Sequence, residues 1–270
     1  MQGRLSPMID GKVQSFPAAT WREEFPLAQA CGFSLIEWVF DAPDWTDNPI
    51  VTAAGRREIR ELAESCQLAV PVLCADYFMH RPLTSGDDQV RREARGVLED
   101  LIQNAAAVGL RQIELPCIGA ASLKSEPAAS EAIAIFNSLA PLLETHEVDL
   151  LLEVDLGPSD AARLFEQLTT PRVGMNYDTG NSAWWGFNPV EEFAAYGPWI
   201  RNVHIKDTTK KDYSVPLGSG EVDFDLTFGL LRDVKYAGDF ILQTARQADD
   251  EAAARQFAAF PRRHIERYLA

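Results

Sequence analysis

Short, mostly apolar runs recur along the chain, and longer segments with apolar residues at helical spacing separate them. Within most runs the apolar positions are consecutive rather than alternating, as in parallel strands that are buried on both faces. We therefore expect eight strands. Their predicted ranges are 12–16, 34–40, 69–74, 112–115, 149–154, 172–177, 202–205 and 239–243.

The segments between these runs predict amphipathic helices, each with one face toward a core. Asn188 followed by Pro189 has the pattern of an N-cap residue with proline at the first helical position. Two apolar stripes stand out, one made of Val90, Ala94, Val97, Leu101, Ala105 and Val108, and the other of Ile133, Phe136, Leu139 and Leu143.

Regular alternation of strands and helices predicts an α/β protein, and eight such units match the (β/α)8 TIM barrel better than a doubly wound sheet. The 270 residues suit one domain of this kind, and the sequence has neither an internal repeat nor a Pro/Gly-rich linker. We therefore expect a single barrel domain over residues 1–270. In such barrels the chemistry is placed at the C-terminal ends of the strands.

Charge and composition limit the classes of partner that the protein can bind. The formal net charge of −15 and a pI near 4.7 oppose binding to nucleic acid or to an anionic membrane surface. Pro7 and Asp10 interrupt the apolar run that a signal peptide needs, and no stretch reaches membrane-spanning length, so we expect a cytoplasmic protein. The cysteines lack a C-x-x-C pair and read as small buried residues.

The last four predicted strands each carry one coordinating group near the C-terminal end. Neighbouring strands of a closed barrel lie about 4.8 Å apart, so side chains at similar heights on consecutive strands can converge on one point. Two carboxylates, an imidazole and an amide oxygen suit Mn²⁺, Mg²⁺ or Co²⁺. These groups are Glu153, Asp178, His204 and Gln243.

A structural polar cluster is the alternative to a metal site, because a single histidine in a strand is usually a satisfied core residue. Glu153, however, follows three leucines. A glutamate buried in such surroundings is costly unless it is paired or coordinated, which favours the metal site.

The segments "LLLEVD", "MNYDTGN", "VHIKD" and "FILQTAR", in this order, resemble the metal-binding strand ends of the xylose isomerase-like TIM barrels, a family of sugar phosphate isomerases and epimerases. "FPAATWREEFPLAQACGFSLIEWVFD" and "VPLGSGEVDF" are similar to further parts of that family. The resemblance covers nearly the whole chain. It implies an isomerase that holds one divalent ion, Mn²⁺ first and Mg²⁺, Co²⁺ or Zn²⁺ as alternatives, and acts on a sugar or sugar phosphate.

Carried over by position, the resemblance makes Glu153 a ligand and the catalytic base, which removes a proton next to a carbonyl to give an enediolate. Gln243 departs from the family pattern, which has a second glutamate there. An amide oxygen can bind a cation, but it cannot accept a proton at ordinary pH. Lys206, Glu221 or a metal-bound water could supply the second group of an epimerase. Isomerisation by one base, dehydration of a keto-sugar or keto-inositol, and binding without catalysis stay open.

Further residues are candidates for substrate binding, each with a plainer alternative. His80 and Arg81 follow the third run and could instead be solvated, and Lys206 could instead form an ion pair with Asp178 or Asp207. Arg246 lies just past the last run, where barrels often bind phosphate. Trp38 and Trp184 could wall a pocket, pack in the core, or form the interface of a homodimer or homotetramer.

Overall fold

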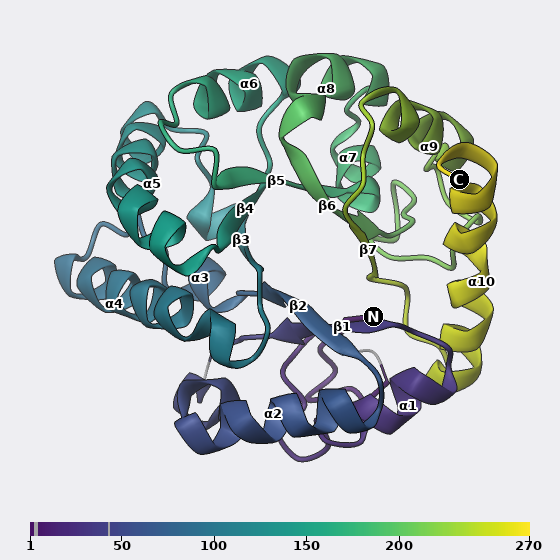
Figure 1. The fold of residues 1–270 in the computed structure, drawn as a ribbon. Helices are drawn as coiled ribbons and strands as arrows, with labels where there is room; N and C mark the ends of the chain where they lie inside the picture. Colours follow the sequence, from purple (N-terminus) through teal and green to yellow (C-terminus); the bar gives the residue numbers. More distant parts are fainter. Residues whose placement is uncertain (3–4, 43) are drawn as a thin grey trace.

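The computed structural model describes residues 1–2, 5–42 and 44–270, and in these ranges seven parallel strands form one sheet. Each strand pairs with the next along the chain, so the sheet curls into a nearly closed barrel with helices outside it (Figure 1). The predicted TIM barrel is therefore confirmed. The strands are β1 (Leu35–Val39), β2 (Ala69–Cys74), β3 (Gln112–Cys117), β4 (Asp149–Val154), β5 (Val173–Asp178), β6 (Ile200–Ile205) and β7 (Asp239–Leu242).

The predicted strand at 12–16 is wrong. Within it, Lys12 makes only an isolated antiparallel bridge with Ile9, and the segment is a loop. The start of the chain lies beside β1 instead, where Gln2 forms an isolated parallel bridge with Glu37. The misleading apolar pattern has a physical cause, because Phe16 packs on the ring of Trp38 although its backbone belongs to no ladder.

Helices lie between the strands and cover the outside of the barrel (Figure 1). The predicted stripes face inward, since Val97, Leu101, Phe136 and Leu143 are buried. The α-helices are α1 (Glu24–Ala30), α2 (Ala53–Ser65), α3 (Tyr77–His80), α4 (Asp88–Asn104), α5 (Glu126–His146), α6 (Pro158–Glu166), α7 (Thr179–Trp185), α8 (Pro189–Tyr196), α9 (Phe224–Asp233) and α10 (Asp250–Tyr268). Short 3-10 turns are η1 (Trp45–Asp47), η2 (Pro49–Val51), η3 (Ala105–Ala107), η4 (Gly119–Ala121) and η5 (Gly197–Trp199).

The structure also tests the predictions made from single residues, such as the helix cap and the cysteines. The side chain of Asn188 accepts a hydrogen bond of 3.0 Å from the backbone N–H of Val190, which caps α8 as predicted. The four cysteines are buried and form no disulfide. Among the described residues, no helix has both the length and the apolar character needed to cross a membrane.

Candidate metal centre

Three predicted ligands meet at the C-terminal ends of consecutive strands. Glu153 on β4, Asp178 on β5 and His204 on β6 are buried, and each offers one ligand atom within 4.8 Å of the other two. The Nδ1 of His204 lies 3.5 Å from Glu153 Oε2 and 3.9 Å from Asp178 Oδ2. The register of the sheet explains the convergence, because Asp178 and His204 are direct partners in the β5–β6 ladder.

The three side chains suit a divalent cation. Among the described residues, the buried atoms Asp178 Oδ2 and His204 Nδ1 have no hydrogen-bond partner. Burial without a partner costs about 1–3 kcal/mol for such a group, so both atoms would gain from a shared cation. Two carboxylate oxygens and an imidazole nitrogen form a donor set that binds divalent metals.

A third acid, Glu37, contacts the side of His204 that faces away from the other two acids. Glu37 on β1 is fully buried, and its Oε1 lies 3.1 Å from the Nε2 of His204. With the proton on Nε2, the lone pair of Nδ1 points to the site. Burial works to lower the pKa of His204, but the carboxylates of Glu37 and Glu153 raise it well above its ordinary value. The surroundings therefore favour positive charge at this point.

Two amides fix the orientation of Glu153. Asn176 donates to its Oε2 over 2.9 Å, and Asn181 donates to its Oε1 over 2.7 Å. Asn181 is itself placed by Asp178, whose Oδ1 accepts from the backbone N–H of Asn181 over 2.8 Å and caps α7. The Oδ1 of Asp178 thus positions Asn181, while its Oδ2 faces the candidate metal site.

Gln243, the predicted fourth ligand, lies directly after β7 and is 8% exposed. Its Nε2 donates to Gln14 Oε1 over 3.1 Å, so the amide oxygen is the atom turned away from Gln14. Gln243 lines the same cavity as Glu153. Its place in the coordination shell stays a prediction.

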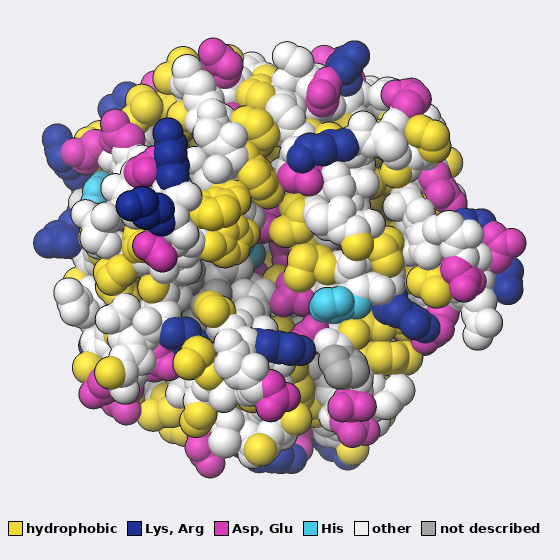
Figure 2. Space-filling model, turned by 180° about the vertical axis from the view of Figure 1, so that it is seen from behind, with side chains coloured by type: hydrophobic (Ala, Val, Ile, Leu, Met, Phe, Trp, Pro, Cys, Tyr) yellow, Lys and Arg dark blue, Asp and Glu magenta, His cyan; other side chains and the backbone are white. Residues whose placement is uncertain are grey.

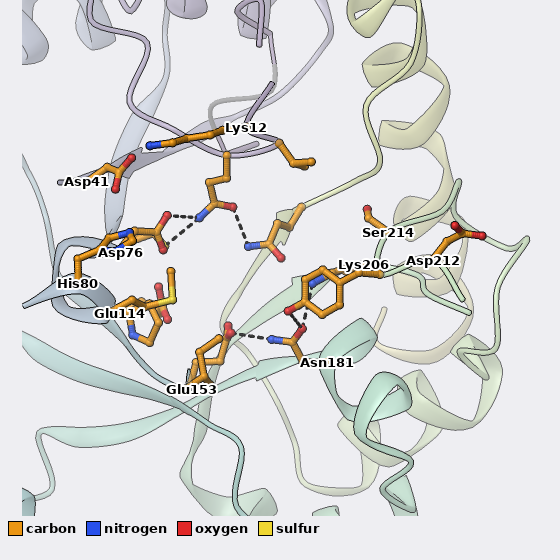
Figure 3. Close-up of a pocket in the computed structure, with 18 of the residues that line it drawn as sticks. Lys12, Asp41, Asp76, His80, Glu114, Glu153, Asn181, Lys206, Asp212 and Ser214 are labelled. Carbon is orange, nitrogen blue, oxygen red and sulfur yellow. Dashed lines mark hydrogen bonds between the residues drawn. The ribbon is translucent and has the colours of Figure 1, made fainter. Parts of the chain in front are cut away.

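The cavity above these strand ends has a volume of about 680 Å³, which is in the usual range for small-molecule sites. Figure 2 shows the hollow at the centre of this face, with acidic side chains inside it. In Figure 3, Glu153, Asn181 and Lys206 lie on one side, and Asp41 and Asp76 lie on another. The lining includes both carboxylates and ammonium groups.

Lys206 lies in the cavity wall, and its contact with substrate stays a prediction. Its Nζ donates to Asn181 Oδ1 over 2.9 Å and lies 3.4 Å from the centre of the Tyr213 ring. The alternative of an ion pair also holds in part, because Nζ is 3.9 Å from Asp178 Oδ2. Tyr213, which the sequence analysis did not single out, donates its hydroxyl to Asn181 Oδ1 over 2.5 Å.

The loop after β6 carries Tyr213 to the cavity, and Asp207 shapes this loop. The carboxylate of Asp207 accepts hydrogen bonds from the backbone N–H groups of Gly218 at 2.8 Å and Gly220 at 2.9 Å. At Gly220 a Cβ would lie 2.1 Å from Asp207 Oδ1, so only glycine fits this turn.

The other predicted substrate contacts divide between the cavity and its surroundings. His80 lines the cavity, whereas Arg81 forms an ion pair with Glu93. The guanidinium of Arg246 donates to the backbone oxygens of Val13 and Ser6. Their roles in substrate binding stay predictions.

Neither of the two predicted tryptophans is among the described residues that line the cavity. Trp38 is buried and donates its indole N–H to Asn48 Oδ1 over 3.0 Å. Trp184 is 38% exposed and packs edge-on against Tyr213, with ring centres 5.3 Å apart.

Glu221, a candidate for the second group of an epimerase, is exposed, and its carboxylate accepts a hydrogen bond from the backbone N–H of Lys210.

The sequence analysis did not single out the acids near the ends of the early strands. Among them is Asp76, which follows β2 and accepts two side-chain hydrogen bonds. Its Oδ2 accepts from Gln14 Nε2 over 2.5 Å, and its Oδ1 accepts from the thiol of Cys74 over 3.4 Å. Burial raises the pKa of Asp76 to about 7, although the hydrogen bond from Gln14 opposes the shift.

Known proteins resemble this chain over most of its length. A putative L-ribulose-5-phosphate 3-epimerase, SgbU, from Haemophilus influenzae is 27% identical over 249 residues, 86% of each chain. The solved structure of an L-ribulose 3-epimerase superposes with a TM-score of 0.78 at 16% identity, covering 94% of this chain and 91% of that one. The IOLI protein with a bound zinc atom gives a TM-score of 0.76 at 15% identity, with coverage of 92% and 94%.

Residues 25–264 match the family model described as xylose isomerase-like TIM barrel. This match spans most of the chain, and it agrees with the parallel barrel and with the acids and histidine at its strand ends. The chain therefore belongs to the xylose isomerase-like TIM barrel family.

Proposed function

We propose that this protein is a divalent-metal-dependent isomerase or epimerase of a ketose or ketose phosphate, which acts by removing a proton next to the carbonyl. The observation that carries the proposal is the meeting of Glu153, Asp178 and His204 at a cavity of sugar size. Relatives named as L-ribulose-5-phosphate 3-epimerases support the reaction class and the substrate class.

Glu153 is the base in this proposal. A proton next to a carbonyl is too weakly acidic for a carboxylate to remove unless the developing enediolate is stabilised. A divalent ion held by Glu153, Asp178 and His204, with Gln243 as fourth ligand, would supply the stabilising positive charge. The hydrogen bonds from Asn176 and Asn181 hold both oxygens of the Glu153 carboxylate in place for the transfer.

The donor set also bears on which metal is bound. With Gln243 included, three oxygens and one nitrogen favour Mn²⁺, Mg²⁺ or Co²⁺ over thiolate-preferring ions. Zn²⁺ is the further alternative, since a protein of similar fold has a bound zinc atom. We propose Mn²⁺ as the first ion to test.

Lys206 supplies positive charge on the substrate side. Its ammonium lies between Asn181 and the face of Tyr213, within the cavity wall. There it can donate to a hydroxyl, carbonyl or phosphate oxygen of the substrate. His80, which lines the same cavity, is the second proposed substrate contact.

The test is turnover of a panel of ketoses and ketose 5-phosphates by protein loaded with Mn²⁺. We expect a product of unchanged mass, and Glu153→Gln should abolish its formation without unfolding the protein. Glu166→Gln, an exposed change at the end of α6, is the control and should keep full activity. A product lighter by one water would identify a dehydratase, and full activity in Glu153→Gln would contradict the role of Glu153.

A further inference from the structure

Asp76 occupies a position that structural needs do not explain. It precedes α3 at the N-cap, yet its side chain makes no capping hydrogen bond. Within residues 1–2, 5–42 and 44–270 it has no ion-pair partner within 4.0 Å. At 6% exposure it lines the cavity that contains Glu153. A buried acid without a cation or a cap is costly, which points to a chemical use.

A chain of amides connects Asp76 to the position where the family pattern has an acid. Gln243 donates to Gln14 over 3.1 Å, and Gln14 donates to Asp76 over 2.5 Å. Each amide thus uses its N–H on the next acceptor, and the chain ends on a carboxylate. Position 243 thus carries an amide in place of an acid, but the carboxylate of Asp76 lies two hydrogen bonds away and lines the same cavity.

The placement of Asp76 relative to Glu153 suits a sugar carbon between them. Asp76 follows β2 and Glu153 lies on β4, and these strands are on either side of β3. Two strand spacings separate their backbones by roughly 10 Å. Figure 3 shows the two carboxylates entering the cavity from different walls.

Another acid in this region fits less well. Glu114 lies on β3, and the ladder pairs it with Leu151, whereas Glu153 pairs with Pro116. Glu114 is therefore two residues deeper in the barrel and is fully buried. Glu114 lines the same cavity, but it does so from this deeper level of the barrel.

We propose that Asp76 is the second proton-transfer residue of this cavity, and that it makes the reaction a two-group epimerisation; this rests on the proposed function. Glu153 takes the proton from one face of the carbon next to the carbonyl, and the C–H electron pair enters the enediolate. The carboxylic acid of Asp76 then gives its proton to the opposite face of the same carbon. Glu153 leaves the cycle protonated and Asp76 ionised, and exchange with water restores both.

The protonation equilibrium of Asp76 agrees with a role in proton transfer. Burial raises its pKa to about 7, so both the acid and its carboxylate are populated near neutral pH. A general acid or base works best when its pKa lies near the working pH. In the reverse direction Asp76 is the base and Glu153 is the acid.

The test uses Asp76→Asn in the 270-residue protein loaded with Mn²⁺, in D2O, with each of two epimers supplied separately. The amide oxygen that this substitution introduces can still accept from Gln14, so the amide chain is kept. Asp155→Asn is the matched control, because Asp155 is a buried acid after β4 that pairs with Lys124 outside this cavity. Thermal unfolding checks that each variant folds, and Asp76→Glu tests whether a carboxylate restores activity.

We expect Asp76→Asn to slow epimer formation by about 10²-fold or more, the usual contribution of a general acid or base. The epimer whose proton faces Glu153 should still take up deuterium, while the other should not, and Asp76→Glu should recover part of the epimerisation. Epimerisation by Asp76→Asn at the wild-type rate, or equal loss of exchange from both epimers in the folded variant, would overturn the proposal. If the wild-type protein neither exchanges nor converts any ketose, the proposed function fails and this inference fails with it.

Discussion

The Oε1 of Glu37 lies 3.1 Å from the Nε2 of His204, although the two residues are 167 positions apart in the chain. The contact joins β1 to β6 across the interior of the barrel. A carboxylate in this position fixes the imidazole and raises its basicity, so that Nδ1 becomes a better ligand. The proposed metal centre therefore includes a residue that would not itself contact the cation.

Replacing this carboxylate should weaken metal binding. Glu37→Gln keeps the size of the side chain and removes its charge, and we expect the Kd for Mn²⁺ to rise about 10- to 100-fold, as for other partners of metal-bound histidines. Titration calorimetry measures the change, with Glu166→Gln as an exposed control. An unchanged Kd in Glu37→Gln would show that His204 does not depend on Glu37.

Substitutions of Gln243 should move metal affinity in opposite directions. Gln243→Ala removes the proposed neutral oxygen ligand, and we expect roughly tenfold weaker binding of Mn²⁺, which corresponds to about 1.4 kcal/mol. Gln243→Glu adds a full negative charge and should bind the ion more tightly than the wild type. The same calorimetric titration checks both, and equal Kd values in all three proteins would exclude Gln243 from the metal site.

The loop after β6 should be sensitive to a single methyl group. In Gly220→Ala the new Cβ would lie 2.1 Å from Asp207 Oδ1 and 2.4 Å from the backbone oxygen of Thr208, so the loop must shift and carry Tyr213 with it. We expect a lower Tm and a loss of activity. Gly229→Ala in α9 is the control, because its Cβ would meet nothing within 4 Å and alanine favours a helix by about 1 kcal/mol. Equal behaviour of the two variants would contradict the role given to the loop.

Asp76 should make the stability of the fold depend on pH. Its pKa is raised from 3.8 in the unfolded chain to about 7 in the fold, so the folded state binds the proton more tightly. The proton on Asp76 therefore stabilises the fold fully below about pH 4, and this stabilisation is lost as the pH rises through 7. The loss in the free energy of unfolding is at most about 4 kcal/mol. Asp41, Cys74 and Glu153, which surround Asp76, are the same in the wild type and in Asp76→Asn, so the comparison isolates the effect of Asp76.

The measurement is chemical denaturation of wild type and Asp76→Asn between pH 4 and 8. The free energy of unfolding of the wild type should fall relative to that of the variant as the pH rises. A difference between the two proteins that stays constant across this range would show that the pKa of Asp76 is not raised.

Much of this molecule could be predicted from the sequence, because parallel strands buried on both faces leave unbroken apolar runs. Seven of the eight predicted ranges contain a strand, and the acids and histidine at the ends of β4, β5 and β6 meet as expected. The segment at 12–16 misled because a loop that packs Phe16 on Trp38 has the same composition as a short strand.

The rest of the site depends on tertiary contacts. Glu37 carried a usable signal, since it is an acid inside the apolar run "SLIEWVF", as Glu153 is inside its own run. Asp76 carried none, because its role comes from Gln14, which approaches from a loop 62 residues earlier in the chain. Only the folded barrel brings that loop over the end of β2.

Deuterium uptake from D2O, followed by NMR on a ketose or ketose phosphate, tests whether Glu153 removes a proton next to the carbonyl. For the wild-type protein loaded with Mn²⁺, we expect one deuterium at the carbon next to the carbonyl. Both removal of the metal by a chelator and Glu153→Gln should prevent uptake at the face served by Glu153. Uptake that persists unchanged in the folded Glu153→Gln variant, or no uptake by metal-loaded wild type with any ketose of the panel, would contradict the proposed chemistry.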